Sequence, residues 1–559
     1  MKKFNFFSEL IIEKRYYFMS EAIFNELSKI PGFSNLEQEA QDFFKEVCEQ
    51  QKSETKTIYI KPREADMLYC DNSMDSPDFA TILSFFEDIS IEIRYSSNVF
   101  FSISNILEKL KDKELPNMKV IVFISSRRQF TNFPSSKIIN EIKIDSSITT
   151  IAPNEFYCFT SLNKITIPSS ITSIGELSFY ECSELTELVI PSSVTQIGSK
   201  AFFNCFSLTK VDLPSTLTTL GSYAFEDCHS LKDITIPASL TTLSDGVFQG
   251  CSSLVEMTIP SGSTLIPPLF FALCKSLEKV TIPSSVISIG FSAFDGCESL
   301  TEIELPEAIE KIDDSTFSRC IQLQKVTLPT SLKSIGIFAF SSCETLTEIT
   351  VPSSVTKIGN STFNGCKSLK KVTIESKLES IGENAFNDCQ SLTEIDLPAS
   401  VKSIDKEAFK DCKALVKFNV PSSVTVIDNG TFSGCSSLKE ITMPESVTLI
   451  HNSAFSGCSS LEQLVIPAAV VSIGNYSFSG CGALKEVRIP PVVKTIGNYA
   501  FTDCKSLSKV AIMNPNVNFG FGIFKGSPVA EIMHPSPLKI NVSRPILAIK
   551  ATVVVKKIE

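Results

Sequence analysis

This 559-residue chain contains eighteen cysteines, and cysteine is its most abundant residue type with a reactive, metal-binding side chain. Cysteine thiolates ligate metals, act as nucleophiles and form disulfides. Fifteen of the eighteen recur at steps of 23 residues from Cys182 to Cys504, which predicts a single interior column. Neighbours in such a column lie within disulfide distance, but their Cβ vectors are parallel and each inner cysteine has two equivalent partners. We therefore favour reduced, packed thiols over disulfides.

Metal binding and catalysis have less support than this packed column. The chain has no C-x-x-C pair and only three histidines. It also lacks the motifs of phosphate-binding loops, dinucleotide-binding turns, zinc proteases and serine hydrolases. Its carboxylates occupy repeat positions, where solvation or pairing between strands explains them without a catalytic role. We predict no enzyme, no cofactor and no metal, and an enzyme with chemistry near the N-terminus is a distant alternative.

Bulk composition narrows the class of partner. The net charge is -11 and the pI is near 5.2, which disfavours nucleic acid and anionic membrane surfaces. The start of the chain, residues 1–18, is interrupted by charged residues and does not read as a signal peptide. The apolar tail Ile546–Val555 is too short to span a bilayer. We expect protein partners, no nucleic acid and no membrane insertion; the oligomeric state stays open.

The elements that position these side chains follow from one internal repeat. A phenylalanine recurs every 23 residues from Phe156 to Phe524, which gives seventeen copies without an insertion. The unit reads L-x-x-I-x-I-P-S-S-V-T-x-I-G-x-x-A-F-x-x-C-x-S. Alternating apolar residues such as Ile395 and Leu397 predict a short half-buried strand, and Pro398 ends it. The A-F-x-x-C segment predicts a single helical or 3₁₀ turn that places Phe and Cys inside.

This unit resembles the leucine-rich repeat of the BspA-like surface-antigen family, over roughly residues 133 to 535. The resemblance implies an α/β repeat fold, a solenoid with a parallel sheet on one face. It also implies a cell-surface or secreted protein that adheres to host matrix proteins, other cells or other microbes. The missing signal peptide departs from that pattern and leaves a cytosolic location open.

Exposed strand positions form columns along the predicted sheet. The position before the first strand isoleucine alternates in sign from Lys164 to Lys509, broken by the Asp233–Glu256 pair and by Gln463. Opposite charges on neighbouring strands contribute roughly 0.2–1 kcal/mol each, so we interpret this column as fixing register. The next exposed position is mostly Thr, which strand propensity explains. The irregular C-terminal end is the better binding candidate of this face, at Gln463, Val465 and Arg488.

The turns around Ala-Phe-x-x-Cys form a second candidate surface. Their variable positions are polar in C-terminal copies and apolar further toward the N-terminus, which suggests a contact patch. The alternative is that these residues pack on one another or on the N-terminal region. Sequons begin at Asn360, Asn429, Asn475 and Asn541, and turn chemistry accounts for the three that share one repeat position. The apolar candidates are Phe203, Phe206, Tyr223, Leu269, Phe270, Leu273, Phe291, Ile337 and Phe338.

Three regions are expected: an N-terminal helical and α/β capping region at 1–130, the solenoid at 131–535 and a C-terminal cap or tail at 536–559. The two functional hypotheses are a surface adhesin and a cytosolic interaction scaffold. In the first region the patterns predict strands at Lys56–Ile60, Ile89–Tyr95 and Lys119–Ser125, and helices at Phe24–Glu49, Pro77–Asp88 and Phe100–Lys113.

Overall fold

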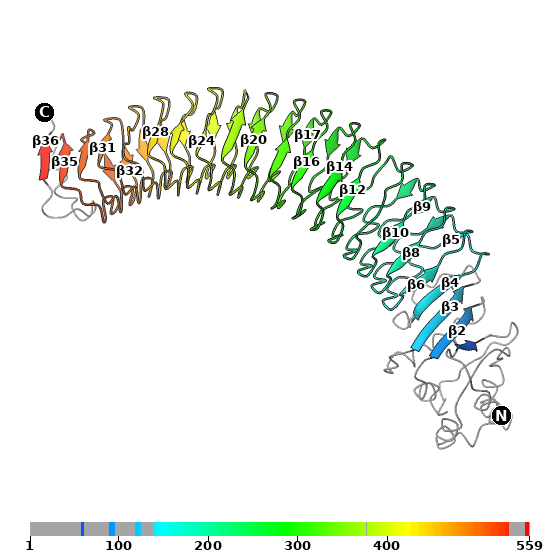
Figure 1. Ribbon diagram of the computed structural model, residues 1–559. Coiled ribbons are helices and arrows are strands. Elements are labelled where there is room, and N and C mark those ends of the chain that lie inside the picture. The colour runs from blue at the N-terminus through cyan, green and yellow to red at the C-terminus, as the bar shows by residue number, and fades with distance from the viewer. Residues whose placement is uncertain are drawn as a thin grey trace, which may run out of the picture. The chain divides into compact units, whose positions relative to one another are not determined.

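The computed structural model describes residues 139–375, 377–535 and 554–557, together with the backbone of 57–60, 89–95 and 118–124. The chain divides into two compact units, Met1–Leu254 and Val255–Glu559. In both units each copy of the 23-residue repeat forms one coil, and successive coils stack through parallel strand pairs (Figure 1). Positions within a coil are counted below from its repeat phenylalanine, so that position −2 lies two residues before it.

The first unit carries two rows of strands. The first row begins with a five-stranded parallel sheet in the order β1-β2-β3-β4-β6 and continues with the pair β8 and β10. The second row is a four-stranded sheet in the order β11-β9-β7-β5. The first row comprises β1 (Thr57–Ile60), β2 (Ile89–Tyr95), β3 (Met118–Ile124), β4 (Ile139–Ile144), β6 (Lys164–Thr166), β8 (Glu187–Val189) and β10 (Lys210–Asp212). The second comprises β5 (Thr150–Ile151), β7 (Ser173–Ile174), β9 (Gln196–Ile197) and β11 (Thr219–Leu220).

The second unit repeats this plan, and its strands run side by side from β12 to β36 (Figure 1). The first row comprises β12 (Glu256–Thr258), β14 (Lys279–Thr281), β16 (Glu302–Glu304), β18 (Lys325–Thr327), β20 (Glu348–Val351), β22 (Lys371–Ile374), β24 (Glu394–Ile395), β26 (Lys417–Asn419), β28 (Glu440–Thr442), β31 (Glu486–Ile489), β33 (Lys509–Ile512), β35 (Glu531–His534) and β36 (Val554–Lys557). The second comprises β13 (Leu265–Ile266), β15 (Ser288–Ile289), β17 (Lys311–Ile312), β19 (Ser334–Ile335), β21 (Lys357–Ile358), β23 (Ser380–Ile381), β25 (Ser403–Ile404), β27 (Val426–Ile427), β29 (Leu449–Ile450), β30 (Ser472–Ile473), β32 (Thr495–Ile496) and β34 (Asn518–Phe519).

The repeat phenylalanines form the core, as the sequence predicts. All of those from Phe156 to Phe524 are at most 1% exposed. Consecutive rings stack: the Phe179–Phe202 centroids lie 5.1 Å apart in the first unit and the Phe455–Phe478 centroids 5.2 Å apart in the second. A single coil cannot bury its ring, so the neighbouring coil supplies the other face. The core therefore exists only where coils are stacked.

The segment around each phenylalanine is a run of turns, and the predicted helical turn is wrong. Positions −2 and +2 have positive φ in every coil; Lys200 has 52° and Asn204 has 58°. A right-handed helix needs negative φ throughout. The N–H groups of Lys200, Phe202 and Asn204 donate to carbonyls of the next coil at 2.8–2.9 Å rather than within their own coil. The described residues thus form a parallel-strand β-solenoid that contains no helix.

The repeat glycine at position −4 has a reason beyond turn formation. A Cβ built on Gly221 would lie 2.3 Å from the backbone nitrogen of Ser199 in the preceding coil. The corresponding Cβ on Gly198 would lie 2.4 Å from the nitrogen of Glu176. Both distances are far inside van der Waals contact, so the coils approach closely because a side chain is absent.

The three strands predicted near the N-terminus are confirmed as β1, β2 and β3, with ends shifted by at most one residue. They pair in parallel with one another and lead into β4, the first strand of the repeat region. The predicted helices at Phe24–Glu49, Pro77–Asp88 and Phe100–Lys113 lie outside the described residues. The capping role of residues 1–130 and the region boundaries stay predictions.

Candidate functional site

The charged column of the first row lies in the register that its alternating signs predict. Lys210 stands directly opposite Glu187 in the first unit, and Lys417 stands opposite Glu440 in the second. The Lys417 ammonium lies 3.3 Å from the Glu440 carboxylate, with both side chains more than half exposed. Exposed pairs of this kind contribute at most about 1 kcal/mol. The column aligns strands and leaves little unbalanced charge for a partner.

The irregular end of this face is solvent-exposed, as a binding candidate must be. Gln463 and Arg488 are exposed, and Val465 is 76% exposed. Val465 and Arg488 pair across neighbouring coils as an isolated parallel bridge. Val189 holds the same repeat position in the first unit and is 73% exposed, so an open valine is not confined to this end, and one valine is not a patch.

The second surface is what we call the flank: positions −4 to +4 of each coil, where the turns lie. In the first unit Phe203 and Tyr223 are half-buried and Phe206 is 40% exposed. The Phe206 ring stacks on His229 at 5.2 Å. The Lys200 ammonium lies 4.9 Å from the Phe203 centroid and 5.4 Å from that of Tyr223, within cation–π range of both. Phe203 and Tyr223 therefore form a cluster around Lys200, and Phe206 forms a separate pair with His229.

Sequence reasoning missed two members of this cluster. Tyr157 and Tyr180 occupy position +1, the position of Phe203 in the next coil. Tyr157 stacks on Tyr180 at 4.6 Å and 6°, and Tyr180 stacks on Phe203 at 4.7 Å and 3°. Tyr157 is 43% exposed. The signal was available, because three aromatic residues at intervals of 23 must lie above one another.

In the second unit the exposed apolar candidates are Phe291, Ile337 and Phe338, at 48%, 42% and 41%. Leu269 and Leu273 are half-buried. Phe338 also has a φ of 55°. Position −2 has a positive φ in every coil, so this conformation belongs to the turn and is not special to Phe338.

Phe270 does not belong to this surface. Its side chain is fully buried and meets Phe271 edge to face at 4.7 Å. It occupies position −1, where Val247 and Ala293 are also buried in their coils. The prediction of a surface position is wrong because the adjacent Phe-Phe pair was assigned one inward ring and one outward ring. Position −1 is buried in every coil from Ser178 to Ile523, as its usual alanine indicates.

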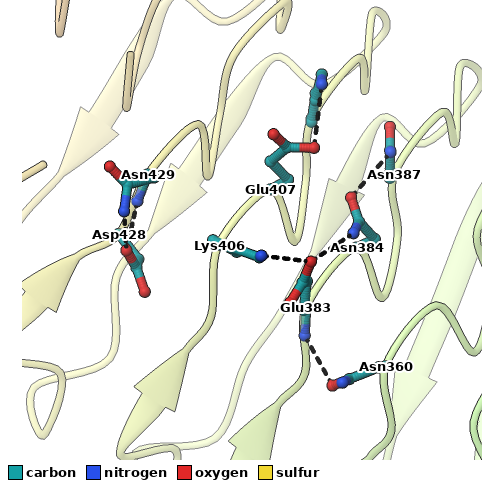
Figure 2. Close-up of polar contacts among 9 residues, drawn as sticks. Asn360, Glu383, Asn384, Asn387, Lys406, Glu407, Asp428 and Asn429 are labelled. Carbon is teal, nitrogen blue, oxygen red and sulfur yellow. Dashed lines mark hydrogen bonds and ion pairs between the residues drawn. The ribbon is translucent and has the colours of Figure 1, made fainter. Parts of the chain in front are cut away.

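Further along the second unit the flank is filled by polar side chains that satisfy one another. Figure 2 shows that Asn360 Oδ1 accepts the Glu383 N–H at 3.1 Å, and that the Glu383 carboxylate pairs with Lys406 at 2.8 Å. Asp428 Oδ1 accepts the Asn429 N–H at 2.6 Å and its side-chain amide at 2.9 Å. This stretch is occupied with internal contacts between and within coils.

Two of the sequon asparagines, Asn429 and Asn475, belong to a row of asparagines with a structural role. Asn429, Asn452, Asn475 and Asn498 occupy position −3 of consecutive coils, and each Oδ1 accepts the N–H at position −3 of the next coil. These distances run from 2.7 to 3.2 Å. We call this row the asparagine ladder. It pairs backbone donors that the turns leave unpaired within their own coil.

The column thiols are packed donors. Cys205 Sγ donates to the Phe179 carbonyl at 3.3 Å, and Cys458 Sγ donates to the Phe432 carbonyl at 3.2 Å. Burial raises the pKa of these thiols, that of Cys504 to about 12. Thiols held in this way are poor nucleophiles and poor metal ligands at neutral pH. Among the described residues, no group of three or more His, Cys, Asp or Glu is placed to hold a metal ion.

These features define a leucine-rich-repeat solenoid: parallel strands, one buried phenylalanine per coil, and exposed columns on the sheet and flank. The model of the BspA type leucine rich repeat region matches residues 129–232, 174–301, 287–416, 356–485 and 405–531, which together exceed half of the chain. The chain belongs to this family of repeat proteins.

Solved structures with similar repeats include three bacterial proteins. A leucine-rich repeat protein from Bacteroides ovatus is 23% identical over 78% of this chain and 92% of that one, with a TM-score of 0.48. A leucine rich cell surface protein from Faecalibacterium prausnitzii is 26% identical over 62% and 87%, with a TM-score of 0.36. A leucine rich repeat protein from T. pallidum is 26% identical over 33% and 83%, with a TM-score of 0.28. No curated protein matches the chain.

The structure offers no helix in its described part that is long and apolar enough to cross a membrane.

Proposed function

We propose that this chain is a non-enzymatic protein-binding protein of the BspA type, a surface antigen or adhesin that recognises host, matrix or microbial proteins. The observation that carries the proposal is the exposed apolar group Phe291, Ile337 and Phe338 on the flank of the second unit. Large apolar side chains at solvent positions of a repeat scaffold are typical of a contact surface.

The local backbone supports this interpretation. Ser315 and Ser361 occupy position −2 in the coils on either side of Phe338, with φ of 55° and 54°. The fold therefore accepts a small polar residue at this position, and the turn itself does not require an aromatic ring. Positive φ at this position is common to every coil, so what distinguishes Phe338 is an exposed ring that the turn does not require, and this supports a role outside folding.

The same comparison of coils supplies substitutions that keep the fold. Phe338→Ser copies the neighbouring coils, and Phe291→Asn and Ile337→Asn place at position −3 the residue of the asparagine ladder. A matched control is Tyr476→Ser with Phe521→Asn, which changes positions −2 and −3 at residues 45% and 56% exposed. Both variants replace exposed apolar residues at the same repeat positions, in different coils.

The test measures binding of the full chain to a panel of purified matrix proteins, including collagen and laminin. We expect binding to at least one of them, a loss of tenfold or more in the triple variant, and no more than a twofold change in the control. Unchanged binding by a triple variant that melts like the wild type would remove the proposed contact surface.

The second candidate function is a cytosolic interaction scaffold. It is favoured by the cysteine column, whose cysteines are packed as free thiols rather than joined in disulfides. Labelling intact cells with a membrane-impermeant amine reagent separates the two. Labelled protein supports the adhesin. Protein that stays unlabelled while known surface proteins react favours the scaffold, and partners are then sought in lysate.

A further inference from the structure

The flank of the first unit combines an aromatic stack with an excess of acid. The rings of Tyr157, Tyr180 and Phe203 lie parallel at separations of 4.6 and 4.7 Å, so their faces cover one another and their edges remain at the surface. In the five coils from Phe156 to Phe248 the flank holds one lysine, Lys200, and six carboxylates. The carboxylates are Glu155, Glu176, Glu181, Glu226, Asp227 and Asp245.

The acid is placed against the rings. Glu181 occupies position +2 beside Tyr180, and its Oε2 accepts the Cys158 thiol at 3.3 Å. Burial, followed by neighbouring acidic groups that include Glu181, raises the pKa of both Tyr157 and Tyr180. Phenols with raised pKa values stay protonated at neutral pH. The surface thus presents ring edges and neutral hydroxyls within a negative potential.

The lone lysine is already engaged. Its ammonium lies over Phe203 and Tyr223, and its charge acts on Glu226, whose pKa is nevertheless raised by burial. Glu226 Oε1 accepts the Gln249 amide at 3.1 Å, while Glu226 Oε2 is buried without a protein partner. One end of the aromatic stack therefore already shows a cation held against two rings, close enough for its charge to act on a carboxylate.

We propose that the aromatic and acidic flank of the first unit, from Tyr157 to Asp227, binds an arginine-rich segment of a protein partner. This proposal rests on the proposed function, because it names the chemistry of one protein partner. The alkyl part of an arginine packs on ring edges, and its planar guanidinium forms paired hydrogen bonds with carboxylates and tyrosine hydroxyls. Lysine offers a point charge without that fork and binds more weakly at such a site.

The chain supplies fold-compatible variants for each part of the surface. Tyr157→Ser, Tyr180→Ser and Phe203→Ser place at position +1 the residue that Ser433, Ser456 and Ser479 provide in other coils. Glu181→Asn and Asp227→Asn follow Asn204, which holds position +2 between them with a φ of 58°. The matched charge control is Asp388→Asn with Asp411→Asn, two half-buried carboxylates at position +2 in the second unit.

The experiment measures anisotropy of fluorescein-labelled octa-arginine with the full chain at physiological salt, beside octa-lysine and octa-glutamate. We expect octa-arginine to bind the most tightly. Affinity should fall at least tenfold in the serine triple variant and in the Glu181/Asp227 variant, and less than twofold in the Asp388/Asp411 control.

Absence of octa-arginine binding by the wild-type chain would overturn the proposal. So would wild-type affinity in the serine triple variant, or equal losses in the two charge variants, which would indicate a general effect of net charge. The Phe291/Ile337/Phe338 variant should bind octa-arginine normally. Octa-arginine binding without matrix-protein binding would count against adhesion while leaving the arginine site intact.

Discussion

The flank of the first unit between Tyr157 and His229 and that of the second unit between Asn429 and Asn498 have the same backbone and opposite surfaces. Both have positive φ at positions −2 and +2. The first carries stacked aromatic rings edged with carboxylates, whereas the second carries the asparagine ladder, many serines and glycines, and the exposed ring of Tyr476. The turns therefore do not dictate these side chains. The second surface serves the stacking of coils, and the first has side chains that stacking does not require.

The largest expected effect is one that the two regions share. Phe202→Ala in the first unit and Phe455→Ala in the second each remove a fully buried, stacked ring. Each should cost about 3–5 kcal/mol in the free energy of unfolding, because a ring-sized cavity remains between coils. Chemical denaturation checks this. Costs that differ by several kcal/mol would show that the repeat ring is not packed in the same way in the two units. The exposed Phe338→Ser serves as the near-neutral control.

Thiol reactivity gives the next effect. Burial raises the pKa of the column cysteines in both units, so they should react with iodoacetamide at pH 8 only after local opening. The half-exposed Cys158 should react roughly 100-fold faster than Cys205 or Cys458. Mass spectrometry of peptides from timed labelling measures this. Rapid labelling confined to one unit would show that its coils open independently of the other unit's.

The asparagine ladder should distinguish the two regions directly. Asn475→Ala removes the oxygen that accepts the Asn498 N–H at 2.7 Å, at a cost of about 1 kcal/mol, since this donor can partly turn to water. Ser199→Ala changes the same position −3 in the first unit, where serine replaces asparagine, and should be nearly neutral. Thermal melting of both variants tests the contrast, and equal shifts would contradict the structural role of the ladder.

The smallest effect concerns the acid at position −4 next to the ladder. Burial, and after it the Asp428 carboxylate, raises the pKa of Asp405 above its ordinary value of 3.8. Folding then disfavours the ionised form, so Asp405 lowers stability at pH 7 and ceases to do so once it is protonated in both states. Asp405→Asn should raise the melting temperature slightly at pH 7, with a gain that shrinks toward pH 4. A constant gain would exclude this cause.

The repeat period predicted what is buried, because packing must be the same in every coil. The positions of Phe, Cys and the strand isoleucines followed directly, as did the charge register. The turns were harder to predict. Position −2 accepts Lys200, Phe338 and Gly430 alike, so residue type gave no sign of its positive φ, and a helical turn appeared equally suitable.

The exposed surface was predicted only in part. Aromatic residues were recognised as candidates one at a time, so the stack of Tyr157 and Tyr180 on Phe203 was missed although its spacing was visible. Phe270 was misplaced because inward and outward positions are adjacent in the turn. Stacking of side chains between coils depends on which way each position points, and that requires the backbone of the turn.

Alternate N–H groups of the turns, such as those of Lys200, Phe202 and Asn204, donate to the next coil, so each coil is bound directly to its immediate neighbours. Under a pulling force, a terminal coil within a unit can detach without disturbing those behind it. Each detachment frees 23 residues, up to about 80 Å of extended chain. A chain tethered at both ends would then lengthen in equal increments, and each increment would lower the tension on the coils that remain stacked.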